Sequence, residues 1–167
     1  MDESQAGRGL SDELRLLFFR SAGERFAIDV AYVREIIPQQ EVTPVPFVPD
    51  TVAGIINHRG TIYTLIRFSR LAQLGEDQPG AIVLLRLPEM AVGVEVQAIE
   101  GIERVSGRLI HATTEGALAP TVPFLRRARD PSGLLVHALD AELLIDTIYQ
   151  LPELARTGEG TSSARPN

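Results

Sequence analysis

The sequence predicts a mostly β protein with a small barrel or sandwich architecture and one helix near its end. Short apolar runs rich in β-branched residues recur along the chain, and Gly or Pro separates nearly all of them. Clear helical periodicity occurs once, close to the end. Long helices between the strands are missing from this pattern, which argues against a doubly wound α/β fold. With 167 residues and 44% hydrophobic content, the chain can bury the core of one domain or of two small lobes.

The first half of the chain predicts a hairpin followed by further strands. The apolar run 14–20 and the return run 25–30 flank a Ser-Ala-Gly turn, which is typical of a hairpin. Residues 43–49 hold three prolines, so they are expected to form an extended surface connection, because proline donates no ladder hydrogen bond. The remaining predicted elements of this half are the strands 33–37, 51–57 and 61–68 and a helical turn at 69–74.

The second half, which opens at Gly80, also predicts strands. The run 81–87 is almost continuously apolar, and residues 92–97 show the cleanest two-residue period of the sequence, with valine at every second position. Residues 99–105 and 133–139 continue the strand character, whereas 111–132 are rich in turn residues and poorly patterned.

The end of the body is predicted to be helical, and polar tails flank the body. Asp140 is placed to cap this helix, since apolar residues follow it at helical spacing (Leu143, Leu144, Ile148 and Leu151). Residues 1–12 and 155–167 have low apolar content and predict flexible tails. The folded domain is therefore expected to span 13–154.

The composition predicts neither a catalytic centre nor a cofactor or metal site. The chain has no cysteine, and all 16 of its Lys and Arg residues are arginine, which excludes a cysteine nucleophile and lysine-based catalysis. His58, His111 and His137 do not stand at metal-ligand spacing. No serine lies in a Gly-x-Ser-x-Gly elbow. We therefore expect a protein that acts through its surfaces and not as an enzyme.

The charge balance narrows the class of partner. A formal net charge of −6 argues against nucleic-acid binding and against adhesion to anionic lipid. No apolar run approaches the roughly 20 residues that a membrane-spanning helix needs, so no membrane insertion is expected. The absence of cysteine suits a reducing cytoplasm.

Two segments stand out as candidate binding elements. The first is Val33-Arg34-Glu35-Ile36, and the second is the run 54–60, which begins and ends with glycine and contains Asn57 and Arg59. The second segment is typical of a strand that ends in a turn, from which Arg59 projects. Two interpretations remain open: Arg59 pairs with an acid and stabilises the fold, or it forms a docking point with the apolar surface around it.

The order of these motifs resembles the CheW-like coupling proteins of bacterial chemosensory systems. The resemblance rests on V-x-E-I, a proline-bearing stretch, G-x-x-N-x-R-G, V-G-x-x-V and a final L-D-x-E-x-L-L. In this chain they are residues 33–36, the prolines at 44, 46 and 49, and residues 54–60, 92–96 and 139–144. The likeness extends over about 14–151, nearly the whole predicted body.

The resemblance implies a fold, a non-enzymatic function and a set of partners. The implied fold is two SH3-like five-stranded β-barrel lobes around a shared core with a C-terminal helix, lobe 1 at roughly 24–79 and lobe 2 at roughly 80–138. Such proteins couple the cytoplasmic domains of methyl-accepting chemoreceptors to the regulatory domain of a CheA-type histidine kinase, in cytoplasmic chemosensory arrays. Receptor tips dock near the groove between the lobes. The residues expected to bind partners, receptors above all, are Val33, Glu35, Gly54, Asn57, Arg59 and Gly60.

Three positions depart from the family pattern. Thr64 and Arg67 replace a proline and an aspartate, and Gln97 replaces an acid. Together with a shortened second lobe, these changes predict weakened or lost binding to the kinase domain. Divergent couplers of this kind occur in the Frz-type chemosensory system of gliding bacteria, which suggests the same origin here.

Two other functions are compatible with the same pattern. The chain could bind receptors and modulate array assembly without binding the kinase, or it could be a small SH3-like barrel domain that binds a peptide or an RNA. The acidic charge counts against RNA. Within the candidate site we expect Glu35 and Arg59 to form an ion pair, so that removing Arg59 would leave Glu35 without a partner.

Overall fold

The computed structural model of the protein describes residues 13–106 and 122–151. The predicted tails at 1–12 and 155–167, the last residues of the predicted domain and His111 lie outside the described residues. Strands make up 52% of the described residues and helices 13%, which confirms the mostly β fold. The strands are β1 (Glu13–Ser21), β2 (Glu24–Asp29), β3 (Val33–Pro38), β4 (Val52–His58), β5 (Thr61–Arg67), β6 (Ala81–Leu85), β7 (Val92–Val96), β8 (Ala98–Ser106), β9 (Leu125–Arg129) and β10 (Leu135–Leu139). The helices are η2 (Val30–Tyr32, a 3-10 turn), α1 (Phe68–Leu71) and α2 (Ala141–Tyr149).

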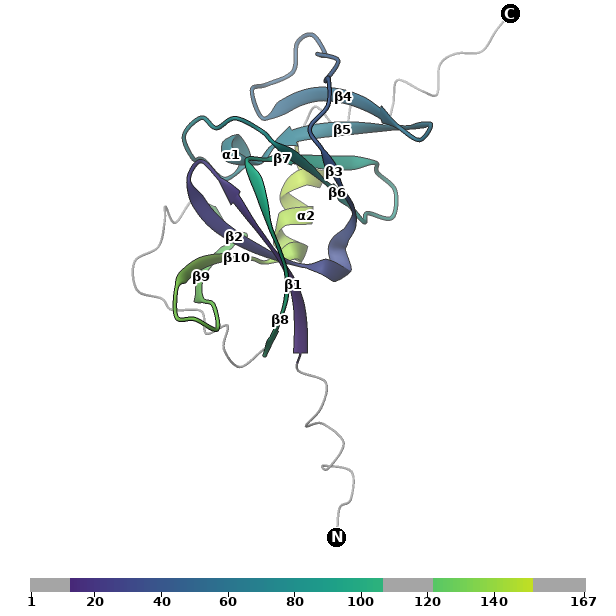
Figure 1. Cartoon of the computed structure of the whole chain (residues 1–167). Helices are drawn as coiled ribbons and strands as arrows, with labels where there is room; N and C mark the ends of the chain where they lie inside the picture. The colour runs from purple at the N-terminus through teal and green to yellow at the C-terminus, as the bar shows by residue number, and fades with distance from the viewer. Residues whose placement is uncertain (1–12, 107–121, 152–167) are drawn as a thin grey trace, which may run out of the picture.

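The strands form two five-stranded sheets (Figure 1). Sheet A has the order β8-β1-β2-β10-β9, and sheet B has the order β3-β6-β7-β5-β4. Most neighbouring strands are antiparallel, whereas β2–β10 and β5–β7 are parallel. Within the described ranges no ladder joins the first strand of either order to its last strand, so hydrogen bonds do not close the sheets into barrels.

The expected division of the strands at Gly80 is wrong. Strands β6 and β7 follow Gly80 but pair with β3 and β5 in sheet B, while β2 lies in sheet A with the later strands. The chain changes sheets at Gln97, where the backbone N–H of Gln97 donates to Arg20 of β1 and that of Gly80 donates to Val96 of β7. Pairing between edges distant in the sequence decides which sheet a strand joins, and a composition break cannot reveal it.

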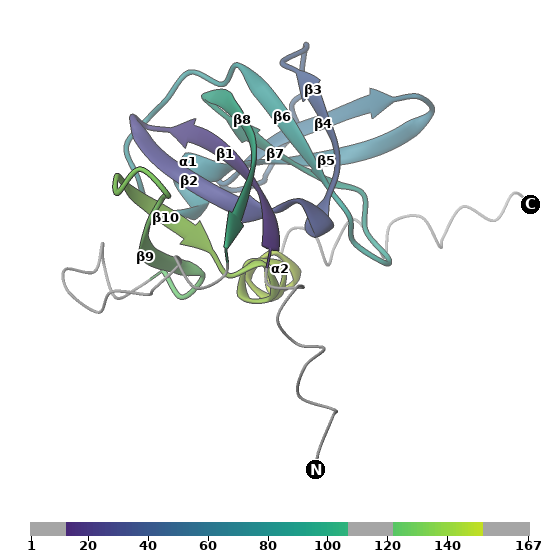
Figure 2. The same cartoon turned by 60° about the horizontal axis from the view of Figure 1, so that its bottom comes forward.

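Both sheets and α2 share one core. The ring centroids of Phe19, Phe26 and Phe68 lie 4.8–5.5 Å from one another, and the Phe68 ring is edge-on to the other two. Leu144 and Ile148 of α2 pack into the same cluster. Figures 1 and 2 show α2 against the two sheets. Buried aromatic residues contribute the largest apolar area per residue, so this cluster dominates the attachment of one sheet to the other.

Several strands are buried on both faces, which explains their continuous apolar runs. In β1, Leu17 and Phe19 face the shared core, while Leu16 and Phe18 face a smaller core inside sheet A. All five residues of β7 are buried, including those between its valines. Gly93 makes this possible, because a Cβ atom there would lie 2.7 Å from Leu65 in the core of sheet B.

The helix cap is confirmed, and one strand was missed. The Asp140 carboxylate accepts a hydrogen bond from the backbone N–H of Leu143 at 3.1 Å, as an N-cap does. Strand β9, at the edge of sheet A, falls in the stretch that was predicted to be turn-rich. Its sequence holds three arginines around one buried residue, Ala128, so it carries almost no apolar pattern.

Candidate functional site

The tip of the β4–β5 hairpin carries the N-x-R-G part of the second motif. His58 and Thr61 pair across the hairpin, so Arg59 and Gly60 form a two-residue turn, and both have positive φ angles of 52° and 85°. Positive φ at both positions defines a type I′ turn, which matches the twist of the strands. The Asn57 side-chain oxygen accepts from the Gly60 N–H at 2.9 Å. The motif thus encodes a rigid turn that presents Arg59 to solvent.

Gly54 allows the proline-bearing connection to lie directly on β4. Thr43 and Ile55 exchange two backbone hydrogen bonds of 2.9 Å across this contact. Gly54 itself has φ +146°, and a Cβ atom on it would lie 2.2 Å from the carbonyl oxygen of Thr43. Gly54 is buried, so it shapes the site and does not offer contact area to a partner.

The predicted ion pair between Glu35 and Arg59 is confirmed, but it has a third member. Arg59 Nη2 lies 3.3 Å from Glu35 Oε1, and His58 Nε2 lies 3.0 Å from Glu35 Oε2. Glu35 belongs to β3 and His58 to β4, the two ends of sheet B. Side chains therefore connect the sheet edges that no ladder joins. We call Glu35, His58 and Arg59 the hairpin cluster.

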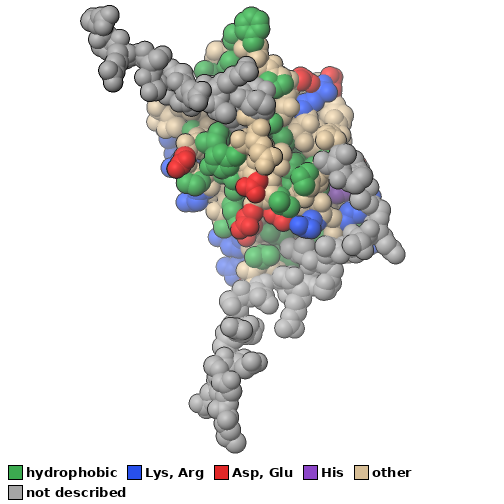
Figure 3. All heavy atoms as spheres, turned by 180° about the vertical axis from the view of Figure 1, so that it is seen from behind, with side chains coloured by type: hydrophobic (Ala, Val, Ile, Leu, Met, Phe, Trp, Pro, Cys, Tyr) green, Lys and Arg blue, Asp and Glu red, His purple; other side chains and the backbone are tan. Residues whose placement is uncertain are grey.

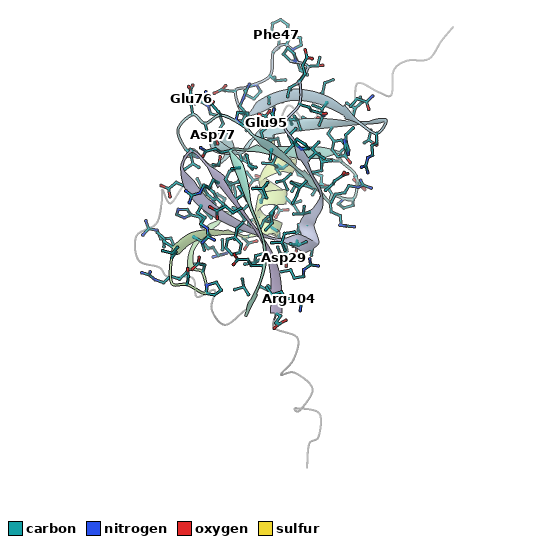
Figure 4. The ribbon with its side chains drawn as sticks, in the orientation of Figure 1. Asp29, Phe47, Glu76, Asp77, Glu95 and Arg104 are labelled. Atoms are coloured by element: carbon teal, nitrogen blue, oxygen red, sulfur yellow. The ribbon has the colours of Figure 1, made fainter. Side chains whose placement is uncertain are left out.

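Removing Arg59 is expected to cost little stability, contrary to the idea that Glu35 would be left alone. The Arg59 side chain is 78% exposed, and Glu35 keeps its contact with His58. Exposed ion pairs contribute about 0–1 kcal/mol, so Arg59→Ala should lower the free energy of unfolding by less than about 1 kcal/mol in urea denaturation. Arg104→Ala, an exposed control on β8 near the opposite end of the molecule (Figure 4), should behave similarly. A loss several times larger for Arg59→Ala would contradict the exposed, shared pair.

The other predicted partner-binding residues divide into exposed and buried. Asn57 and Gly60 are exposed beside Arg59, and Glu35 is partly exposed. Val33 is buried in the shared core, next to a bulge in the β3–β6 ladder. A partner at this surface would therefore meet the hairpin tip, whereas Val33 and Gly54 act from below it.

The three positions that depart from the family pattern lie in different surroundings. Thr64 is partly buried on β5, and its N–H donates to Ala91. Arg67 Nη1 donates to the Asp50 carbonyl oxygen at 2.7 Å and lies 3.4 Å from the Asp50 carboxylate, so its charge is compensated locally. Gln97 is exposed, and its side-chain oxygen accepts from the Gly23 N–H at 3.0 Å. These contacts stabilise connections between elements.

A polar pocket of about 240 Å³ surrounds Arg67 between α1 and β7. Arg70 lies 2.8 Å from Asp50 and 2.6 Å from Glu76, and Asp77 accepts from the Ser21 hydroxyl at 2.6 Å. Figure 4 shows Glu76, Asp77 and Glu95 on this side of the molecule. Because both arginines are paired with acids of the wall, and Asp77 and Glu95 are hydrogen-bonded to residues outside it, we interpret the pocket as structural.

An apolar groove that the sequence did not reveal lies on sheet A. It measures about 420 Å³, and its lining comes from β1, β2, η2, β9, β10 and the start of α2. The lining side chains are Leu14, Leu16, Ala27, Asp29, Tyr32, Arg126, Ala138, Leu139, Asp140, Ala141 and Glu142. Figure 4 shows Asp29, one of the lining residues, near the lower end of the body. On the face opposite to that of Figure 1, hydrophobic side chains lie beside acidic ones (Figure 3). Because six separate elements contribute, no local motif could have indicated this groove.

Phe47 is the second surface feature that the sequence reading did not single out. It is fully exposed, has a positive φ of 61° and stands at the tip of the proline-bearing connection, pointing away from the body (Figure 4). The signal in the sequence was a lone aromatic residue between two prolines.

The described residues hold no group of three or more His, Cys, Asp or Glu that could bind a metal ion. Over the same ranges, none of the helices has the length and apolar character required to cross a membrane.

The chain matches a known protein family over most of its length. The CheW-like domain model matches residues 15–148. The chain is 31% identical over 103 residues to the chemotaxis protein CheW of Rhizobium meliloti (strain 1021), covering 60% of this chain and 66% of that protein. It is 28% identical over 102 residues to the chemotaxis protein CheW of Treponema pallidum (strain Nichols), covering 57% of this chain and 60% of that protein. The match thus spans less than two thirds of these two relatives.

A longer match and a solved structure agree with this. The chemotaxis protein CheW of Klebsiella aerogenes is 27% identical over 145 residues, which cover 85% of this chain and 86% of that protein. The crystal structure of the scaffolding protein TtCheW from Thermoanaerobacter tengcongensis superposes with a TM-score of 0.67 at 20% identity, covering 76% of this chain and 88% of that one. At this identity the structural match shows the fold alone.

Proposed function

Because this chain belongs to the CheW-like domain family, we propose that it is a non-enzymatic chemosensory adaptor that couples methyl-accepting receptors to a CheA-type histidine kinase in cytoplasmic arrays. An adaptor must hold two partners at once, so it needs two separate surfaces. The observation that supports the proposal is that two such surfaces exist: the apolar groove on sheet A and the hairpin cluster on sheet B.

We assign the receptor to the groove. A groove lined by both apolar and charged side chains suits an amphipathic helix, which can bury its apolar face there and offer its polar face to the charged groups. The hairpin tip is instead a narrow charged projection, since the apolar Val33 and Gly54 beneath it are buried. We assign this tip to the kinase regulatory domain, a different division from the sequence-based expectation that the receptor docks there.

A charge substitution in the groove tests the receptor assignment. Leu14 is partly exposed in the groove, so Leu14→Glu should weaken binding of a purified receptor cytoplasmic domain about tenfold or more, while binding of the kinase regulatory domain stays unchanged. Leu134→Glu is the matched control, because Leu134 is an exposed leucine in the β9–β10 turn, away from the groove lining. Isothermal titration against each partner separately gives both affinities.

The outcomes separate the alternatives. Binding of both partners by the wild type supports the coupling function. Binding of the receptor alone would favour a modulator of array assembly that does not engage the kinase. This second function has weaker support, because Asp50 compensates the charge of Arg67, so like-charge repulsion of the kinase is not expected from that residue. Failure to bind either partner would contradict the adaptor function.

A further inference from the structure

The hairpin cluster contains an ionisable group that the family motif does not specify. His58 occupies a variable position of G-x-x-N-x-R-G, yet its ring is largely buried, with 18% of the side chain exposed, and faces Glu35. An ionised carboxylate can only accept hydrogen bonds, so the Nε2 atom that faces Glu35 at 3.0 Å must carry a hydrogen. The imidazole therefore donates to Glu35 in both its neutral and its protonated form.

We propose that protonation of His58 regulates docking at the hairpin tip by releasing the charge of Arg59 to an acidic group of the partner. With neutral His58, the single negative charge of Glu35 balances the single positive charge of Arg59. With protonated His58, Glu35 is balanced by the closer and more buried imidazolium, and the cluster gains one positive charge. The proposal rests on the assignment of a partner to this tip.

The geometry supports an unequal competition for Glu35. His58 lies 3.0 Å from the carboxylate and is mostly buried, whereas Arg59 lies 3.3 Å away on a side chain that is 78% exposed. Coulomb interactions grow as the distance shortens and as water is excluded, so the imidazolium interacts more strongly with Glu35 than the guanidinium does. The Arg59 side chain can then turn to an external carboxylate without leaving a buried charge unpaired.

Within residues 13–106 and 122–151, the contacts around His58 involve three other ionisable side chains. Glu35 of β3 faces the His58 ring, Arg59 in the turn shares Glu35 with it, and the Tyr63 ring of β5 has its centroid 6.4 Å from that of His58. Histidine is the side chain whose charge ordinarily changes between about pH 5 and 8, so two pH values within that range test a histidine-based switch.

The test measures binding of the kinase regulatory domain at pH 6 and pH 8 by isothermal titration. Wild-type protein should bind about threefold or more tightly at pH 6, and the difference should shrink as salt is added, because the contact is between exposed charges. His58→Gln keeps an amide donor toward Glu35 but cannot be protonated, so its affinity should be nearly equal at the two pH values. Glu35→Gln frees Arg59 at both values and should bind tightly at each.

The results distinguish this proposal from the adaptor function. If the wild type and His58→Gln show the same pH dependence, the proposal is wrong while the adaptor function stands. If the wild type binds the regulatory domain at neither pH but binds the receptor, the tip is not a kinase contact. The same pH series is then measured with the receptor. Tighter receptor binding at pH 6 that His58→Gln abolishes supports the role of His58, whereas equal receptor binding at both pH values overturns it. Binding of neither partner overturns both proposals.

Discussion

The Gly54→Ala variant is expected to lose about 3 kcal/mol or more in the free energy of unfolding. A Cβ atom at this position would lie 2.2 Å from the carbonyl oxygen and 2.9 Å from the carbonyl carbon of Thr43, both backbone atoms. The two Thr43–Ile55 hydrogen bonds hold that backbone in place, so it cannot move away without breaking them. The φ of +146° adds strain for any residue with a side chain.

Gly60→Ala is the matched control for this prediction. Gly60 also has a positive φ, +85°, but nothing lies within 4 Å of a Cβ atom there. Its substitution should therefore cost only the backbone strain, about 1 kcal/mol. Urea unfolding followed by circular dichroism measures both variants. Equal losses for the two would show that the contact between the proline-bearing connection and β4 contributes nothing.

The second large effect is expected at Asp130, which directly follows β9. Arg25 of β2 donates to Asp130 and, through Nε, to Glu100 of β8 at 2.6 Å. The guanidinium carbon lies 4.6 Å from the centroid of the Phe18 ring. Since β8 and β9 are the two ends of sheet A, Arg25 connects edges that no ladder joins. In each sheet, a cluster of charged side chains thus connects the two edge strands: the hairpin cluster in sheet B and the Arg25 contacts in sheet A.

Asp130 also organises the β9–β10 turn. Its Oδ1 atom accepts from the Ser132 N–H and hydroxyl at 2.9 and 2.6 Å and from the Leu134 N–H at 2.9 Å. Burial alone would raise the pKa of this carboxyl, but the hydrogen bonds from Ser132, Arg25 and Leu134 outweigh it and lower the pKa to about 2. The ionised carboxylate is therefore more favoured in the folded than in the unfolded protein.

Asp130→Asn should destabilise the protein by about 2 kcal/mol at pH 7. A lowered pKa contributes stability that is fully present above the unfolded value of 3.8 and is lost as the pH falls toward about 2. Wild-type stability should therefore fall between about pH 5 and pH 2, and the variant should show a shallower fall. Part of the loss of stability at low pH remains in the variant, because two other carboxyl groups also have lowered pKa values. A hydrogen bond from Arg25 lowers the pKa of Glu100, and a hydrogen bond from the Leu143 N–H lowers the pKa of Asp140.

Asp146→Asn, an exposed substitution on α2, is the control for the loss of one acidic charge. Chemical denaturation at a series of pH values measures the free energy of unfolding for all three proteins. An Asp130→Asn variant that follows the wild-type curve at every pH would show that the Arg25 cluster does not stabilise sheet A.

Local sequence chemistry was sufficient wherever a few adjacent residues determine the structure. Asp140 caps α2 because a carboxylate can reach the N–H three residues on, and the Asn-x-Arg-Gly run forms a tight turn because its residues accept positive φ. The strands were predicted from their apolar and β-branched residues, apart from β9, which has too few. The Glu35–Arg59 pair was predicted because both residues lie beside apolar strand residues, where an unpaired charge is costly, and because the family resemblance places an acid beside this arginine.

The tertiary structure alone decided which strands share a sheet and what lies at the surface. Whether β6 joins β3 depends on hydrogen bonds between edges about 45 residues apart, and their energies are the same for any apolar partner strand. The groove exists only where β1, β2, η2, β9, β10 and α2 meet, so none of these segments carries its signature. His58 likewise gains its role from Glu35 on a strand distant in sequence. Hydrogen bonds within a turn or a helix cap depend on residues adjacent in the sequence. Binding surfaces and pairs of residues distant in the sequence form only when the whole chain is packed.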